Sequence, residues 1–477
     1  MTADNAVEYE SRQRLAEKTL ERLRKSGVIT DAAGSASRRR VAVEAAHRRV
    51  FDFTTLPEYQ PFRYARAASD LSGVGSPYFR LHAGRAADIS EIDGSIVVNF
   101  SSYDYLGLNG EPFIVEAAKA AIDRYGTSVS ASRLVAGERP IHRELEAALA
   151  RVHGVDAALS FVSGHATNVT TVGCLMGLKD LVLADALIHN SVAEGIRLSG
   201  AARLSFPHGD LDAAETLLRT HRSRHRRVLI VVEGLYSMDG DVPDLARLVA
   251  LKQHYDAWLM VDEAHAFGVL GASGRGIAEE QGVDPREVEI WMGTLSKSLA
   301  GAGGYIAGSD ALIDYLKFAA PGHLYSVGLA PSLAATATAA IGMLEREPER
   351  VRRLRTNGQL FVERAKAAGL DVGASIGASV VPVIVGDSLI AVFLSNALLL
   401  RGFNVIPIVF PAVAERQARL RFFITSRHTT DQIEAVVAAT AEELGRLRSN
   451  PDLMHKLLEG INREQLLKPV EEEALPQ

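Results

Sequence analysis

Lys297 lies among small and hydroxylated residues, with hydroxyl groups at Thr294, Ser296 and Ser298, and Gly301-Ala302-Gly303-Gly304 follows it. Small side chains let a flat ligand approach the backbone, and the hydroxyl groups could hold a phosphate. A lysine in such a pocket loses its proton more readily and can form a Schiff base with an aldehyde. Taken alone, this stretch favours a solvated loop lysine. The interpretation therefore depends on residues upstream.

An apolar strand upstream, Trp258-Leu259-Met260-Val261-Asp262, ends in an aspartate, and His265 follows. In an open α/β sheet, ligands bind beyond the carboxyl ends of the strands. A carboxylate there can keep a pyridine nitrogen protonated, which makes pyridoxal phosphate an electron sink. The letters Asp-Glu-Ala-His also occur in a helicase box, but that interpretation requires an earlier G-x-x-x-x-G-K-[ST] loop, which the sequence lacks. Lys297 and Asp262 together predict a pyridoxal phosphate site.

The composition excludes several classes of protein. The chain has 477 residues, 47% hydrophobic and 23% charged, which is typical of a globular protein with two or three domains. A net charge of −6 without a sustained basic face argues against nucleic acid as a partner. Cys174 is the single cysteine, so we expect no internal disulfide and a cytoplasmic location. We see no signal peptide and no spanning helix, expect at most peripheral membrane contact, and assign no metal ligands.

Strands alternate with helices along most of the chain, which predicts a mainly parallel sheet with helices on both faces. A helix from Pro331 to Glu345 is expected to lead out of this large domain, and a smaller α/β domain follows. We expect strands at 96–100, 159–162, 181–185, 228–232 and 258–262, then a strand at 380–385, a helix at 389–400 and a strand at 420–425.

The predicted organisation has four parts: an N-terminal extension (1–95), a large domain that binds the cofactor (96–345), a small C-terminal domain (346–450) and a tail (451–477). The first fifty residues, with the run Arg38-Arg39-Arg40, are interpreted as a solvated extension or as a docking segment.

A second candidate element is Ser163-Gly164-His165, which follows a short buried strand and precedes a helix. A turn of small residues at this point presents free backbone N–H groups at a helix N-terminus, where a phosphate can bind. Many strand–helix turns share this pattern, so it gains weight only with the other motifs. Those motifs are Asn99-Phe100-Ser101-Ser102-Tyr103-Asp104-Tyr105-Leu106-Gly107, Ser163-Gly164-His165, His189-Asn190-Ser191, Ser237-Met238-Asp239-Gly240, Asp262-Glu263-Ala264-His265, Thr294-Leu295-Ser296-Lys297, and Leu420-Arg421 before His428-Thr429.

Together these motifs resemble the α-oxoamine synthase family of fold-type-I pyridoxal phosphate enzymes, over roughly residues 96–445. The resemblance implies an α/β fold with a mainly parallel large-domain sheet flanked by helices and a smaller α/β C-terminal domain. Members condense an amino acid with an acyl thioester, in most cases with loss of carbon dioxide. They work as homodimers with the site at the subunit interface.

The resemblance also implies roles for single residues. Lys297 would carry the cofactor and later move protons, Asp262 would pair with the pyridinium nitrogen, and His265 would hydrogen-bond the ring oxygen. Further assignments are His189 over the ring and near the substrate carboxylate, Gly164, His165 and Thr294 at the phosphate, Ser237 beside the cofactor, Ser326 at the partner subunit's phosphate, and Arg421 with Tyr103 at the substrate.

Which family member the chain resembles most is a finer question. Leu134 and Val135 offer no polar contact to a succinyl carboxylate, and Tyr103 stands where serine palmitoyltransferases often carry tyrosine. We therefore expect an activity like that of serine palmitoyltransferase, in sphingolipid biosynthesis, with serine or alanine and an apolar acyl group. Against this, Val409-Phe410-Pro411 occupies the region where some of these enzymes place an arginine before two prolines.

Several alternatives stay open. One is an activity like that of 8-amino-7-oxononanoate synthase or 2-amino-3-ketobutyrate ligase, and another is an aminotransferase, which would release a keto acid. The acyl donor could be coenzyme A or an acyl carrier protein, which the arginine run at 38–40 could meet.

Overall fold

The computed structural model describes residues 53–60, 62–63 and 75–449. Contacts divide the chain into two compact units, Met1–Gly73 with Glu459–Gln477, and Val74–Leu458. In the first unit, the described residues include the short 3-10 helix η1 (Phe53–Thr55). The arginine run at 38–40 and the tail expected at 451–477 lie outside the described residues. Every candidate site residue belongs to the second unit, called here the site-bearing unit.

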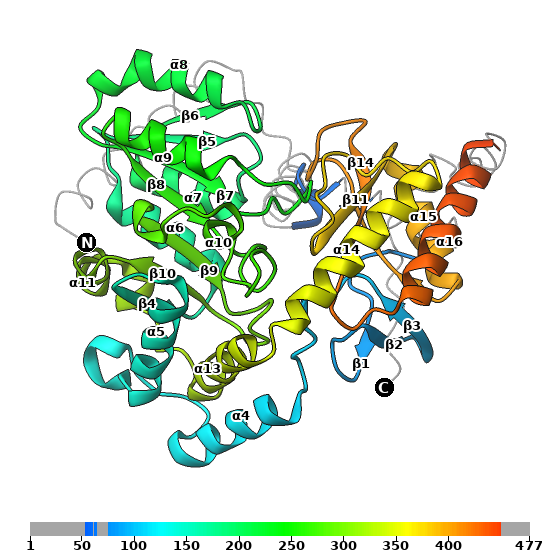
Figure 1. The fold of residues 1–477 in the computed structure, drawn as a ribbon, viewed down its shortest axis with the longest axis horizontal. Coiled ribbons are helices and arrows are strands. Elements are labelled where there is room, and N and C mark those ends of the chain that lie inside the picture. The colour runs from blue at the N-terminus through cyan, green and yellow to red at the C-terminus, as the bar shows by residue number, and fades with distance from the viewer. Residues whose placement is uncertain (1–52, 61, 64–74, 450–477) are drawn as a thin grey trace, which may run out of the picture. The chain divides into compact units, whose positions relative to one another are not determined.

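A seven-stranded sheet lies at the centre of the expected large domain, in the order β4-β10-β9-β8-β7-β5-β6 (Figure 1). Its strands pair in parallel except β10, which is antiparallel to both β4 and β9. The mainly parallel sheet predicted from the alternation of strands and helices is confirmed. The strands are β4 (Ala157–Phe161), β5 (Leu181–Asp185), β6 (Ala202–Phe206), β7 (Val228–Glu233), β8 (Trp258–Asp262), β9 (Ile290–Thr294) and β10 (Gly304–Gly308).

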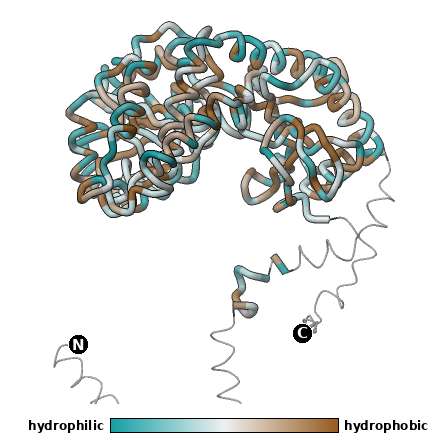
Figure 2. Tube along the Cα trace, turned by 90° about the horizontal axis from the view of Figure 1, so that it is seen from below, coloured by the Kyte–Doolittle hydropathy of each residue, from teal (hydrophilic) through white to brown (hydrophobic). Residues whose placement is uncertain are grey.

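Both faces of this sheet are buried, because successive side chains of a strand point to opposite faces. On β5, Leu181 and Leu183 belong to one apolar cluster, whereas Val182 and Ala184 belong to the other. Burial on both faces is why such strands are continuous apolar runs in the sequence. In Figure 2, brown apolar stretches accordingly recur throughout this unit between teal polar ones.

Helices form the outer layers of the two clusters. The first cluster contains side chains of α5 (Pro140–His153), α8 (Leu211–His221), α9 (Leu245–His254) and α13 (Pro331–Arg346). The second contains side chains of α6 (Gly164–Leu175), α7 (Asn190–Ser199) and α11 (Asp310–Ala319). The helix expected from Pro331 is thus confirmed as α13. The shorter or peripheral elements are α4 (Pro112–Tyr125), η2 (Arg133–Gly137), η3 (Arg222–Arg224), α10 (Ile277–Gln281), η4 (Pro285–Glu287) and α12 (Pro321–Leu324).

Local sequence explains where several of these helices begin and end. α4, α5 and α13 each begin at a proline, whose fixed φ suits the first helical turn and whose missing N–H has no helical partner to lose. α9 begins after Asp244, whose carboxylate accepts a hydrogen bond from Arg247 N at 2.9 Å. α5 ends at His153 and is followed by Gly154, which adopts φ 71°.

The site-bearing unit also contains two smaller sheets. Strands β11 (Val380–Gly386), β14 (Ala418–Phe423) and β13 (Ile406–Ile408) form an antiparallel sheet. It packs with α14 (Glu349–Ala367) and α15 (Ser388–Leu400), and α16 (Thr430–Ser449) packs on both helices. The other sheet joins β1 (His82–Ala83), β2 (Ile89–Ile92), β3 (Ser95–Asn99) and β12 (Phe403–Asn404).

The pairing of β3 differs from the expectation that the strand at 96–100 opens the large domain. β3 runs parallel to β12, and Phe100 N donates a hydrogen bond to Asn404 O at 2.9 Å. Phe100 also stacks on His428, with ring centroids 4.2 Å apart. The division into domains at 96–345 and 346–450 remains a proposal, since this strand pairs across it. Among the described residues, no helix combines the length and apolar character needed to cross a membrane.

Candidate active site

The candidate site lies where β7, β8 and β9 end side by side. Glu233 pairs in register with Asp262, and Asp262 pairs with Met292. A cavity of about 240 Å³ opens at this edge of the sheet. Eight residues predicted from the sequence line it: Gly164, His165, His189, Ser237, Asp262, His265, Thr294 and Lys297.

Lys297 is the candidate nucleophile. Burial lowers the pKa of its ammonium to about 8, although the carboxylates of Asp262 and Glu233 act in the opposite direction. Its Nζ lies 5.6 Å from the centroid of the Tyr103 ring. More of this amine is therefore neutral near neutral pH than of an ordinary lysine, and attack on an aldehyde requires the neutral form.

Asp262 is a buried carboxylate at the end of β8, only 4% exposed. Its Oδ2 accepts a hydrogen bond from Asn168 Nδ2 at 2.9 Å, and its Oδ1 accepts one from Ala264 N at 2.9 Å. Both donors are neutral, and none of the ion pairs in the described part of the chain involves Asp262. A buried carboxylate without a cationic partner is suited to a cationic ligand such as a pyridinium N–H.

Two histidines line the cavity from different elements. His189 precedes α7, and its Nδ1 lies 2.7 Å from Ser191 Oγ. His265 follows β8, and its Nδ1 lies 2.7 Å from the hydroxyl of Tyr105. Burial is the largest cause of the lowered pKa of each imidazole, and the positive charge of Lys297 adds to it. Both rings are therefore neutral at neutral pH.

The N-terminus of α6 forms the candidate phosphate cradle. Gly164 begins this helix, and a β-carbon at that position would lie 3.0 Å from Thr294 Oγ1, so a larger residue would crowd the threonine hydroxyl. Thr294 Oγ1 also lies 2.8 Å from Ser296 Oγ. Free N–H groups, the helix dipole and two hydroxyl groups together suit a phosphate.

Glu233 and Ser237 line the cavity near Asp262. Ser237 N donates to Glu233 Oε2 at 2.9 Å, whereas Glu233 Oε1 is buried without a hydrogen-bond partner in the described residues. Burial raises the pKa of Glu233, and the negative charge of Asp262 raises it further. Glu233 therefore tends to be protonated at neutral pH. The two carboxyl groups of Glu233 and Asp262 together then carry less than two negative charges.

Three predicted residues do not line the cavity. Arg421, on β14, donates from Nη1 to Ser237 O at 3.0 Å, and its buried Nε has no partner in the described residues. Tyr103 is 41% exposed and lies beside Lys297. Ser326 is half-buried, and its neighbours in the chain, Tyr325 and Val327, have exposed side chains.

Sequence reasoning missed four residues that this geometry adds: Asn168, Ser191, Tyr105 and Glu233. Three of them carried a usable signal, since Ser191 and Tyr105 lie inside recognised motifs and Glu233 ends a strand beside Asp262. Asn168 lies one helical turn beyond Gly164, and its partner Asp262 is 94 positions away in the sequence. No local pattern indicates that contact.

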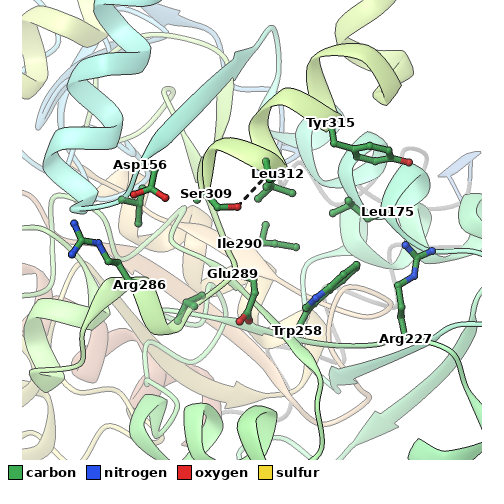
Figure 3. Close-up of a pocket in the computed structure, with 14 residues that line it drawn as sticks. Asp156, Leu175, Arg227, Trp258, Arg286, Glu289, Ile290, Ser309, Leu312 and Tyr315 are labelled. Atoms are coloured by element: carbon green, nitrogen blue, oxygen red, sulfur yellow. Dashed lines mark hydrogen bonds between the residues drawn. The ribbon is translucent and has the colours of Figure 1, made fainter.

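A cavity of about 490 Å³ lies at the opposite, amino ends of the strands (Figure 3). Its walls include Trp258, Ile290 and Leu312, with Arg227 and Arg286 also in the lining. Its lining residues include no lysine, histidine or cysteine. The eight predicted residues that line the smaller cavity thus lie at the carboxyl edge of the sheet, where ligands bind in α/β folds.

The mainly parallel sheet, with a lysine of lowered pKa and a buried aspartate at its carboxyl edge, defines the class of fold-type-I transferases. The chain belongs to the aminotransferase class I and II family, whose profile matches residues 95–439. The 8-amino-7-oxononanoate synthase of Methylobacterium sp. (strain 4-46) is 41% identical over 379 residues, which cover 79% of this chain and 95% of the relative. The 8-amino-7-oxononanoate synthase 1 of Bacillus velezensis (strain FZB42) is 40% identical over 357 residues, covering 74% and 90%.

Solved structures give a compatible result. Serine palmitoyltransferase of Sphingomonas wittichii matches with a TM-score of 0.78 and 28% identity, over 82% of this chain and 98% of that one. The 8-amino-7-oxononanoate synthase of Francisella tularensis matches with a TM-score of 0.64 and 26% identity, over 73% and 98%. The resemblance to α-oxoamine synthases is confirmed at the level of the family.

Proposed function

We propose that this protein condenses an amino acid with an acyl thioester, with loss of carbon dioxide, in a reaction like that of 8-amino-7-oxononanoate synthase. The observation that carries the proposal is that Lys297, whose pKa burial lowers to about 8, and buried Asp262 line the same cavity. The product named for the relatives has nine carbons, with the amino group on carbon 8. Carbons 8 and 9 are what alanine retains after losing its carboxylate, so the acyl group supplies the other seven carbons, of which carbon 1 is a terminal carboxylate.

Pyridoxal phosphate is the cofactor, and the cavity fits it. Its pyridinium matches the Asp262 carboxylate, which has only neutral hydrogen-bond donors, and its phosphate matches the cradle at Gly164 and Thr294. When bound, the cofactor supplies an aldehyde for an amine and a ring that withdraws electrons from the α-carbon of the amino acid.

The residues of the chain supply the proton transfers. Lys297 Nζ, when neutral, takes the proton from the α-carbon of the amino acid and later returns one. Asp262 keeps the proton on the pyridine nitrogen, because its carboxylate has no other cationic partner in the described residues. With the cofactor bound, His265 would donate a hydrogen bond to its ring oxygen, and His189 would contact its ring. The α-carbon of the amino acid bonds to the thioester carbonyl carbon, and the thiolate leaves. The carboxylate of the amino acid then leaves as carbon dioxide.

The remaining candidate residues bind rather than react. Gly164, His165, Thr294 and Ser237 line the cavity. The first three would hold the phosphate, and Ser237 would lie beside the cofactor. Arg421 takes the amino-acid carboxylate with the edge of its guanidinium that includes the unpaired Nε, and Tyr103 packs against the substrate. Ser326 serves the phosphate of a partner subunit, which requires a homodimer.

The relatives favour this reading over the serine palmitoyltransferase activity expected from the sequence. That expectation used Leu134 and Val135 as an apolar wall, but in the single chain they are 58% and 80% exposed. A place in sphingolipid biosynthesis has support only from the likeness to solved serine palmitoyltransferases, which keeps serine with a long acyl chain as the second candidate.

A thiol-release assay tests the proposal. The full-length protein is given alanine, serine or glycine with acyl groups on coenzyme A or on an acyl carrier protein, and products are identified by mass spectrometry. The expected best pair is alanine with a seven-carbon dicarboxylic acyl thioester. Serine with a long acyl chain as the best pair would favour the second candidate. A released keto acid without thiol would indicate an aminotransferase and contradict the proposal.

Peptide mapping tests which lysine carries the cofactor. Borohydride reduction followed by peptide mapping is expected to place the cofactor on Lys297, and Lys297→Ala is expected to abolish both the label and thiol release. A label on any other lysine would refute the assignment.

A further inference from the structure

Each of the two site histidines has one ring nitrogen, Nδ1, in a hydrogen bond to a hydroxyl group. A neutral imidazole carries one proton, so one nitrogen donates and the other accepts. Which nitrogen faces the cavity as a donor decides what each ring can do there. The surrounding hydrogen bonds determine the answer.

At His189, Nδ1 must be an acceptor. Ser191 N lies 3.3 Å from Nδ1, and a backbone N–H can only donate. Ser191 Oγ lies 2.7 Å from the same nitrogen. The ring proton is therefore on Nε2.

Asn168 fixes the direction of the Ser191 hydroxyl. Asn168 Nδ2 lies 2.9 Å from Asp262 Oδ2 and 2.9 Å from Ser191 Oγ. Since an ionised carboxylate only accepts, one amide hydrogen points to Asp262 and the other to Ser191. Ser191 Oγ thus accepts from Asn168, and its own hydrogen is free to point to His189 Nδ1. A directed chain of hydrogen bonds joins Asp262 to His189.

At His265, the partner is a buried phenol. Tyr105 is 0% exposed, and its hydroxyl lies 2.7 Å from His265 Nδ1. Burial raises the pKa of this phenol well above its ordinary value, so it keeps its proton. Donation to Nδ1 gives that buried proton an acceptor, which avoids the cost of an unsatisfied hydroxyl. The proton of the neutral His265 ring is then on Nε2 as well.

We propose that Tyr105 and Ser191 are positioning residues that fix both site histidines in the Nε2–H tautomer, with Asn168 orienting Ser191. Both imidazoles then present an N–H donor to the cavity. His265 Nε2–H is the donor that the ring oxygen of the cofactor needs, and His189 Nε2–H is a donor for a substrate carboxylate. These two uses rest on the proposed function, whereas the tautomers themselves do not.

The test reads the tautomers directly. The full-length protein is labelled with ¹⁵N-histidine, and long-range ¹H–¹⁵N correlation spectra are recorded above pH 7. His189→Gln and His265→Gln assign the two rings. The expected wild-type pattern is a protonated Nε2 and an unprotonated Nδ1 for both residues. A protonated Nδ1 on either ring overturns the proposal, whatever the substrates of the enzyme prove to be.

Variants then test the cause. Tyr105→Phe is expected to shift His265 to a mixture of tautomers and to leave His189 unchanged. Ser191→Ala is expected to shift the tautomers of His189 less than Tyr105→Phe shifts those of His265, because the backbone N–H of residue 191 still donates to Nδ1. In the active enzyme, Tyr105→Phe is expected to lower kcat about tenfold, the typical effect of one lost hydrogen bond.

Tyr305→Phe is the matched control. Tyr305 is another buried tyrosine, and its hydroxyl lies 2.8 Å from His153 Nε2, outside the candidate site. This variant is expected to alter the His153 signals alone. An unaltered His265 pattern in Tyr105→Phe, with an altered His153 pattern in Tyr305→Phe, would refute the role of Tyr105.

Discussion

At the scale of single residues, the site depends on charges that are held out of water. Lys297 loses its proton more readily because burial disfavours the ammonium, and Asp262 is buried without a cationic partner in the described residues. Each group alone would be costly, whereas a bound cofactor with an aldehyde and a pyridinium satisfies both.

The pH dependence of cofactor attachment is expected to report the lysine. Only the neutral amine attacks an aldehyde, so the attachment rate for cofactor-free protein is expected to rise with pH and to level off above a pKa of about 8. Absorbance after rapid mixing measures it, and Lys297→Ala is the blank. A rate that keeps rising to pH 10 would mean that the lysine has its ordinary pKa.

Asp262→Asn is expected to retain some cofactor and to lose most turnover. A neutral amide cannot keep the pyridine nitrogen protonated, so the barrier is expected to rise by at least ~3 kcal/mol, the scale of removing one electrostatic partner. Steady-state kinetics measure the change. Asp180→Asn is the control, since Asp180 is a buried carboxylate paired with Arg226 and Arg227 outside the candidate site. Turnover near that of the wild type would contradict the role of Asp262.

At the scale of elements, the loop around η2 is held by a buried ionic network. The Arg133 guanidinium binds Glu138 at 2.6 Å and Glu146 through both carboxylate oxygens, and only 6% of its side chain is exposed. Glu146 also accepts a hydrogen bond from Ser160 N at 2.8 Å on β4. The network thus ties the loop that presents Leu134 and Val135 to α5 and to the sheet.

Arg133→Met is expected to destabilise the protein by about 3–5 kcal/mol, because it leaves the Glu146 carboxylate buried and without its cation. Urea unfolding measures the loss. Adding Glu146→Gln is expected to restore part of it, since the buried charge is then removed. Arg143→Met is the matched control, because Arg143 also pairs with Glu138 but is 77% exposed. Equal losses in Arg133→Met and Arg143→Met would mean that the network does not hold the loop.

At the scale of the whole molecule, exposed apolar side chains surround Ser326. Tyr325 is 87% exposed and Val327 50%, and Gly328 N donates to Ala131 O at 3.0 Å, which brings the loop of Leu134 and Val135 close. Exposed apolar groups gathered in this way typically mark an interface. We expect a second copy of the chain to cover them.

Light scattering is therefore expected to show a homodimer. Val135→Glu is expected to shift it toward monomer and to weaken cofactor binding, since Ser326 would no longer reach a partner's phosphate. Leu178→Glu is the control, because Leu178 is 87% exposed in the loop between α6 and β5. An active wild-type monomer would rule out the dimer.

The sequence alone determined the class of chemistry and most of the large sheet. Lys297, Asp262 and both histidines were found because each lies next to a strand end or inside a short motif, and such patterns depend on neighbours in the chain. Strands β5, β7 and β8 could be predicted because burial on both faces requires a continuous apolar run.

The tertiary structure alone decided the partners of these residues. The contacts of Asn168 with Asp262, of Tyr105 with His265 and of Arg421 with Ser237 join positions 94, 160 and 184 residues apart. The pairing of β3 with β12 and the antiparallel course of β10 also depend on long-range contacts. No local pattern encodes such contacts, because hydrogen-bond partners that are distant in the chain are chosen by the packing of the whole fold. The tautomers of the site histidines follow from those partners, and so only the folded chain specifies them.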